Sequence, residues 1–242
     1  MSQSQSIEEE TISQRVQSVS KHISKLSEDN HGSSDAVKLI AVSKTFPFSS
    51  MQEAYDAGIV HFGESYPQEF RDKYEPILNS GILEKSVELH FIGSLQRNKV
   101  KYVIGKVCLI HGVDSIKLIN EINKQAEKNN ISQDILLQVN ISDEESKSGF
   151  SYDDLDNAVS HCTDLDYIRL RGLMGISGLE SSDDKRRDEF KGLKKAFDNL
   201  KIRIKNFDYL SMGMSGDYEI AIQEGSNMVR VGSAIFGERS YD

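Results

Sequence analysis

Lys44 is the first residue whose position suggests chemistry. It directly follows residues 39–43, an apolar run typical of a short buried strand. A lysine at the end of such a strand is partly withdrawn from water, which disfavours the charged ammonium and lowers its pKa. The neutral amine is the form that makes a Schiff base with an aldehyde. Taken alone, the same position also suits a rim lysine that reaches past the strand end into solvent.

Two loops of small residues near the C-terminus are candidates for binding a phosphate. They cover residues 211–217 and 230–234, and each leads into a predicted helix. The donors that they offer are backbone N–H groups and one hydroxyl, at Gly213, Gly232, Ser233 and Ser215. Glycines also serve plain turns that need a positive φ. Two such loops with Arg230 between them favour the phosphate site.

The elements that position these residues are short apolar runs alternating with amphipathic helical stretches. The predicted strands cover residues 38–43, 59–63, 88–93, 106–111, 135–141, 168–174, 207–212 and 228–231. The predicted helices cover residues 51–57, 68–78, 97–104, 116–128, 152–160, 185–200 and 218–224, with a short last one at 234–237. Alternation of this kind implies parallel pairing of the strands.

The fold class predicted from this order is α/β, as a single (β/α)8 TIM barrel. Eight units without a linker favour the closed barrel over an open doubly wound sheet, which normally has a glycine-rich turn after its first strand. We expect one domain over residues 1–242, with residues 1–36 forming an extra N-terminal helix and loop. Apolar residues at helical spacing mark that helix, at Ile12, Val16, Val19, Ile23 and Leu26.

A barrel brings the candidate residues together. The active face lies at the carboxyl ends of the strands, and the loops after strands seven and eight frequently bind phosphate. Strands one and eight are neighbours, so Lys44 can meet an aldehyde whose phosphate lies in those loops. Arg230 ends the eighth strand and can reach the far side of the same ring. A Schiff-base lysine beside a phosphate site indicates either pyridoxal 5′-phosphate or a sugar-phosphate aldolase without a cofactor.

Composition excludes several other classes. The net charge is −9, which argues against general binding to nucleic acid or to anionic membranes. The two cysteines, Cys108 and Cys162, show no metal-ligand spacing, so no metal site is expected, and Cys108 is predicted to be a buried small hydrophobe. With no apolar stretch of membrane-spanning length and a polar, acidic N-terminus, we expect a cytoplasmic protein.

Motifs spread over residues 38–239 resemble the pyridoxal phosphate homeostasis protein family. The matching segments are Leu39-Ile-Ala-Val-Ser-Lys44, His61-Phe-Gly-Glu64, His90-Phe-Ile-Gly93 with Leu95-Gln96 and Asn98-Lys99, Gln138-Val-Asn-Ile141 with Lys147-Ser-Gly-Phe150, Gly172-Leu-Met174, Ser211-Met-Gly-Met-Ser215, and Val229-Arg-Val-Gly232 with Phe236-Gly237. Three positions depart from the family pattern, at Ser65, Leu89 and Ser94. Ser65 puts a polar contact of that side chain to the cofactor in doubt, whereas the other two are expected to change packing and strand-end geometry only.

The resemblance implies the fold of the N-terminal barrel of alanine racemase, with pyridoxal 5′-phosphate held as a Schiff base on Lys44. It also implies phosphate contacts from Ser215, Gly232 and Ser233, and an Arg230 that faces the pyridine nitrogen. Family members are thought to bind, buffer or deliver the cofactor without an established catalytic activity. We therefore expect pyridoxal phosphate homeostasis rather than catalysis, with acceptor apo-enzymes as partners.

Arg230 bears on the alternative, a racemase-like amino-acid enzyme of narrow scope. An arginine cannot give up a proton to the ring nitrogen, so the ring would be a poor electron sink. Racemisation also needs a second acid/base, and the chain, ending at Asp242, is expected to lack the domain that supplies it in alanine racemases. For the same reason we expect a monomer. A structural ion pair of Arg230 with Glu64 or Glu238 remains open.

Three histidines, His61, His90 and His111, fall near predicted strand ends. They could in principle supply the missing acid/base. Because nothing in their spacing pairs them, a structural role in the barrel mouth is expected for each.

Overall fold

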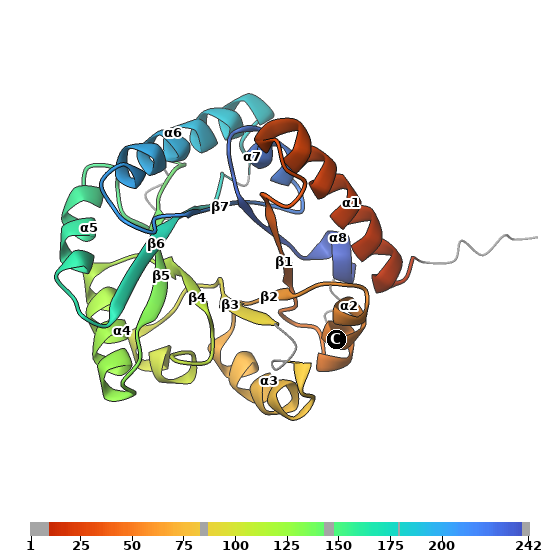
Figure 1. Ribbon diagram of the computed structural model, residues 1–242, viewed down its shortest axis with the longest axis horizontal. Coiled ribbons are helices and arrows are strands. Elements are labelled where there is room, and N and C mark those ends of the chain that lie inside the picture. The colour runs from red at the N-terminus through yellow and green to blue at the C-terminus, as the bar shows by residue number, and fades with distance from the viewer. Residues whose placement is uncertain (1–9, 83–86, 143–147, 179, 239–242) are drawn as a thin grey trace, which may run out of the picture.

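The computed structural model describes residues 10–82, 87–142, 148–178 and 180–238, and they contain a closed barrel of parallel strands. The strands follow one another around the barrel in chain order, and β1 closes the circle by pairing with β8 (Figure 1). The predicted (β/α)8 barrel is confirmed, and the open doubly wound sheet is excluded.

The helices form a ring outside the strands (Figure 1). The strands are β1 (Lys38–Val42), β2 (His61–Glu64), β3 (Glu88–Phe91), β4 (Leu109–Val113), β5 (Gln133–Val139), β6 (Ile168–Gly175), β7 (Tyr209–Met214) and β8 (Met228–Val231). The helices are α1 (Ile12–His31), α2 (Phe48–Asp56), α3 (Pro67–Asn79), η2 (Arg97–Tyr102), α4 (Ile116–Lys128), α5 (Leu155–Thr163), α6 (Asp183–Lys201), α7 (Tyr218–Gln223) and α8 (Ser233–Phe236). Within the described residues, no helix is both long and apolar enough to cross a membrane.

The largest departure from prediction lies between β3 and β4. The helix predicted over residues 97–104 is a 3-10 helix that ends at Tyr102. A turn follows in which Lys106 donates a backbone hydrogen bond to Val103 and Gly105 has a φ of 71°. That turn delays β4 until Leu109, three residues later than the apolar run suggested.

Two separate apolar clusters hold the barrel. The larger one fills the space between the outer face of the sheet and the helices. The smaller one lies inside the barrel and consists of Ile40, Leu109, Leu136, Met174 and Met228. Because side chains alternate between the two faces of a strand, Ile40 in this inner cluster fixes the direction of its neighbours at even spacing. Val42 and Lys44 therefore also point into the barrel.

The extra N-terminal helix α1 packs against the outside of the barrel, next to α2, α7 and α8 (Figure 1). A capping box between Thr11 and Gln14 begins it. It ends at His31, where Gly32 adopts a left-handed φ of 73°. The buried stripe includes Val16, Val19 and Ile23, as the helical spacing predicted.

Candidate functional site

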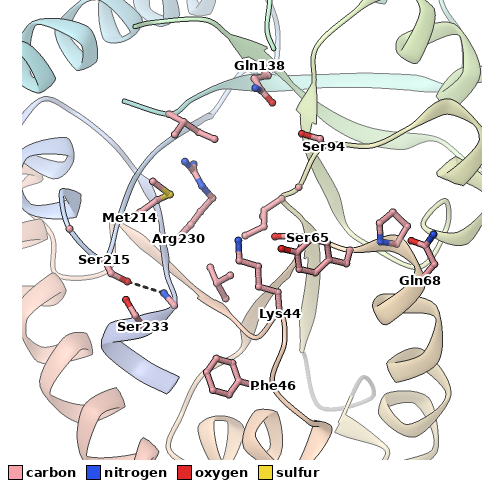
Figure 2. A pocket seen from close by; sticks show the side chains of 18 of the residues that line it. Lys44, Phe46, Ser65, Gln68, Ser94, Gln138, Met214, Ser215, Arg230 and Ser233 are labelled. Atoms are coloured by element: carbon pink, nitrogen blue, oxygen red, sulfur yellow. Dashed lines mark hydrogen bonds between the residues drawn. The ribbon is translucent and has the colours of Figure 1, made fainter. Parts of the chain in front are cut away.

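A cavity of about 740 Å³ opens at the carboxyl ends of the strands (Figure 2). Its lining includes Lys44, Ser215, Arg230, Gly232 and Ser233, which were predicted to bind the cofactor. The barrel has thus brought together residues from the ends of β1, β7 and β8. This size lies within the range of pockets for small ligands and cofactors, roughly 300–1,000 Å³.

Lys44 enters the cavity from the end of β1, and its amine points into the space rather than out past the rim (Figure 2). The side chain is half-buried. The backbone turns sharply directly after it, since Thr45 has a φ of 69° and donates its N–H to Oε1 of Glu69 at 2.6 Å. The alternation of β1 and this turn together set the direction of the lysine.

A buried polar cluster on the other face of the same strand ends supports this turn. The Ser43 hydroxyl donates to Oε1 of Glu64 at 2.7 Å, and Lys73 from α3 donates to the same oxygen at 3.0 Å. Lys73 also donates to the Ser43 carbonyl at 2.8 Å. Burial raises the pKa of the Glu64 carboxyl, although the positive charge of Lys73 opposes the shift. The cluster ties β1, β2 and α3 together beneath Lys44.

The two small-residue loops face each other across one side of the cavity. The Gly232 N–H donates to the Ser215 hydroxyl at 3.1 Å, which links the loop after β7 to the loop after β8 (Figure 2). Ser233 begins α8, and the first turn of any helix has N–H groups without intrahelical partners. These donors and the Ser215 hydroxyl form a neutral cradle of the kind that suits a phosphate.

Asp217 orders the first of these loops, and sequence reasoning missed it. Its Oδ1 accepts the Met214 N–H at 2.6 Å, and its Oδ2 accepts the Ser177 hydroxyl at 2.6 Å. The carboxyl is buried beside the phosphate loop. Its place one residue before α7, where an aspartate often caps a helix, was the available signal.

Gly213 does not line the cavity, so the prediction that its N–H faces the ligand is wrong. It lies buried in β7 with a φ of 95°. A Cβ at this position would lie 2.6 Å from the Cβ of Ala221 and 2.9 Å from the Cα of Tyr218. The glycine is therefore needed for the close approach of α7 to the strand.

Arg230 is almost completely buried at the inner wall of the cavity. Its Nη1 donates to the Ser211 hydroxyl at 2.6 Å and its Nη2 to the Gly175 carbonyl at 3.1 Å. Burial lowers the pKa of the guanidinium to about 10, while the charge of Asp217 opposes the shift. Among the described residues, the ion pair of Arg230 with Glu64 does not form, because Glu64 pairs with Lys73.

The three histidines do not lie in the barrel mouth, which corrects the sequence prediction. They form a column inside the barrel that leads away from Arg230. His111 Nδ1 lies 3.0 Å from the Ser211 hydroxyl, and His111 Nε2 lies 3.1 Å from His90 Nδ1. His90 Nε2 in turn lies 3.3 Å from His61 Nδ1. Since these contacts cross between strands, no spacing along the sequence could reveal them.

Burial keeps the inner histidines neutral. It lowers the pKa of His90 to about 3, with further lowering by His61 and Lys38. It also lowers the pKa of His111 well below the ordinary value, with smaller effects of His90 and Arg230. Arg230 thus donates to the Ser211 hydroxyl, which in turn contacts this neutral column, and to the backbone carbonyl of Gly175.

Several other residues line the cavity without having been assigned a role from the sequence. They include Tyr66, Gln96, Lys99, Gln138, Ile176 and Met214. The departures Ser65 and Ser94 also line it, whereas Leu89 is buried in the outer core. Lys147, part of one of the matching motifs, lies outside the described residues.

Fold and site together define a class: an alanine racemase-like barrel whose mouth holds a lysine beside two loops of small residues. The family model for the N-terminal domain of alanine racemase matches residues 16–240. The chain is 42% identical over 209 residues to the pyridoxal phosphate homeostasis protein of Escherichia coli (strain K12), covering 86% of this chain and 88% of that protein. It is 39% identical over 229 residues to the one of Aquifex aeolicus, covering 94% and 98%.

A solved structure, PipY of Synechococcus elongatus PCC7942 with PLP bound, superposes with a TM-score of 0.81. It is 29% identical to this chain, and the match covers 94% of this chain and 100% of PipY. The chain belongs to the pyridoxal phosphate homeostasis protein family, as its motifs predicted.

Proposed function

We propose that this protein binds pyridoxal 5′-phosphate as a Schiff base on Lys44 and serves in its intracellular homeostasis, by buffering or delivery, rather than in catalysis. The observation that carries the proposal is that Lys44 and both small-residue loops line one cavity. An aldehyde and a phosphate on one small molecule require that combination. The names of the relatives and the PLP-bound neighbour support the same ligand.

Different residues bind different parts of the ligand. The half-buried amine of Lys44 is the nucleophile for the aldehyde, while Ser215, Gly232 and Ser233 donate hydrogen bonds to the phosphate. Arg230 faces the pyridine nitrogen and has only donors to offer. Bound pyridoxal phosphate supplies a reversible aldehyde and a ring that withdraws electrons strongly only when its nitrogen is protonated.

Arg230 is the reason to favour a carrier over an enzyme. With a pKa of about 10 the guanidinium stays charged near neutral pH, so it keeps a proton off the nitrogen that it faces. The column behind it is neutral, and within the described residues the hydrogen bonds of the guanidinium go to a hydroxyl and a carbonyl rather than to a carboxylate. Such a setting disfavours transamination and elimination, which need the strong electron sink. A racemase-like activity of narrow scope is the second candidate, because the family model that matches the chain is that of the N-terminal domain of alanine racemase.

The deciding experiment is the near-visible absorption spectrum of the purified protein after incubation with pyridoxal phosphate. Lys99 provides a matched control, since it is a second lysine lining the same cavity. The wild type and Lys99→Ala are expected to be yellow, and Lys44→Ala is expected to lose the band. A colourless wild type, or a band that survives in Lys44→Ala, would contradict the assignment.

A second measurement separates carrier from enzyme. Incubation of the loaded protein with the common amino acids in deuterium oxide is expected to give no exchange at Cα, and sustained exchange with any one of them would favour the racemase. Transfer to an added apo-enzyme, followed by recovery of that enzyme's activity, tests delivery.

We also propose that the chain is a monomer. No described residue of the cavity requires a second copy to complete the phosphate cradle. Size-exclusion chromatography with light scattering is expected to give the mass of one chain, and a stable dimer would overturn this.

A further inference from the structure

A group of potential metal ligands lies at the opposite end of the barrel from the cavity. His61 begins β2 and Glu88 begins β3, and the two residues are paired in register across these strands. His90 lies two residues further along β3, inside the barrel. One ligand atom from each of the three residues can be chosen so that all lie within 4.8 Å of one another.

The distances within this group fit a small divalent cation. Nδ1 of His61 lies 3.3 Å from Nε2 of His90 and 3.3 Å from Oε2 of Glu88. Ligands bound at about 2.0–2.1 Å to a tetrahedral zinc ion lie about 3.3–3.4 Å from one another. His61 therefore already stands at zinc-ligand spacing from both of its partners.

The chemistry of the donors agrees with the geometry. Two imidazoles and one carboxylate, with a solvent molecule as fourth ligand, form a common open zinc site. Metal-bound histidines usually donate their second ring N–H to a neighbouring acceptor, and Nδ1 of His90 lies 3.1 Å from Nε2 of His111. Half of the Glu88 side chain is exposed, so solvent can deliver an ion to the group.

From these observations we infer that His61, Glu88 and His90 form a binding site for a divalent transition metal, with zinc as the best fit. The inference is independent of the proposed function, because none of the three residues lines the cofactor cavity. Imidazole nitrogen selects this class of metal over calcium and magnesium, which prefer oxygen ligands.

The positive charge of Lys38 lies near the proposed site and opposes the binding of a cation, which provides a second test. Lys38, the first residue of β1, lies at the same end of the barrel, two residues before Ile40, which pairs in register with His61. The same charge repels a metal ion. Removing it by Lys38→Met is therefore expected to tighten metal binding, whereas neutralising Glu88 is expected to weaken it.

The experiment is a calorimetric titration of the tag-free, chelator-treated protein with zinc chloride, repeated with cobalt(II) to obtain a visible spectrum. The wild type is expected to bind one zinc ion per chain. His61→Ala and Glu88→Gln are each expected to weaken zinc binding by at least about tenfold. Loss of a group that only hydrogen-bonds to a metal ligand already has an effect of about this size. The Glu88 side chain is half-exposed whereas that of His61 is mostly buried, so thermal unfolding of each variant checks that it folds.

His22 offers a matched control, because its Nδ1 lies 3.7 Å from Glu219 and so forms a surface histidine–carboxylate pair outside the barrel. His22→Ala is expected to bind zinc like the wild type, and so is Lys44→Ala, which separates this result from the cofactor assignment. The inference is overturned if the wild type takes up no stoichiometric zinc, or if His61→Ala binds it as tightly as the wild type.

Discussion

At the scale of single residues, the direction of each main side chain of the cavity is set by the backbone or by hydrogen bonds to its neighbours. Lys44 takes its direction from the alternation of β1, and Ser215 is held by the N–H of Gly232. Arg230 is held by Ser211 and the Gly175 carbonyl. The site is thus arranged before any ligand enters, which reduces the ordering cost of binding.

Ser215 gives the first prediction at this scale. Replacing it by alanine removes one proposed donor to the phosphate and also the hydrogen bond that links the two loops. Loss of such a hydrogen bond costs about 1–2 kcal/mol, so Ser215→Ala is expected to weaken pyridoxal phosphate binding about tenfold in an absorption titration.

Ser65 supplies the comparison, since it lines the same cavity but stands where the family pattern differs. Ser65→Ala is expected to change the affinity less than Ser215→Ala. Equal losses in the two variants would argue against a phosphate at the cradle of Ser215.

At the scale of elements, the strand ends are joined by buried polar clusters rather than by apolar contacts alone. The cluster of Ser43, Glu64 and Lys73 links β1, β2 and α3, and it contains the one described buried side-chain atom with no hydrogen-bond partner, Oε2 of Glu64. An unpartnered carboxylate oxygen explains why burial dominates the pKa of this group.

This cluster predicts a pH dependence of stability. The pKa of Glu64 is raised above its ordinary value of 4.5 in the folded protein, so the folded state holds more protons than the unfolded state between the two values. Stability contributed by this group therefore falls as pH rises through that window. The difference in unfolding free energy between the wild type and Glu64→Gln is expected to decrease from pH 4.5 upward, measured by urea unfolding.

Glu75→Gln, at an exposed position of α3, the helix that carries Lys73, controls for the removal of a charge. If the difference for Glu64→Gln grew with pH instead, the ion pair with Lys73 would outweigh burial.

At the scale of the whole molecule, α1 connects the N-terminal region to the side of the barrel that carries the phosphate loops. His22 Nδ1 lies 2.9 Å from the Tyr218 hydroxyl at the start of α7, and His31 Nε2 lies 3.2 Å from the Ile222 carbonyl. The buried stripe of α1 packs beneath these contacts. The helix is therefore part of the structure that holds α7 and α8 in place.

Ile23 tests this role of α1. It is 3% exposed in the stripe, so Ile23→Ala is expected to lower the free energy of unfolding by about 2–4 kcal/mol. Ile202 is 89% exposed, and Ile202→Ala is expected to change it by less than about 0.5 kcal/mol. Chemical unfolding of the two variants compares them directly, and similar values would mean that α1 is only loosely attached.

The sequence predicted the barrel because strands and helices alternate regularly along it, and this alternation implies parallel pairing of the strands. It also predicted Lys44, Ser215, Arg230, Gly232 and Ser233 as neighbours, since strand ends meet at one face of a barrel. It failed for Gly213, because only the packing of α7 reveals what that glycine is for. It failed as well for Cys108, predicted to be buried but exposed once β4 began later than expected.

The hydrogen bonds along the histidine column all run in one direction through the barrel interior. Arginine has no acceptor, so Ser211 accepts from Arg230 and can offer its own hydrogen to Nδ1 of His111. That choice places the ring protons of His111 and His90 on Nε2, each aimed at the next imidazole below. A metal at the base claims the lone pair on Nε2 of His90, which requires every proton in the column to turn the other way. Metal binding at the base would therefore change the hydrogen-bond partner of the Ser211 hydroxyl, at the far end of the column beside Arg230.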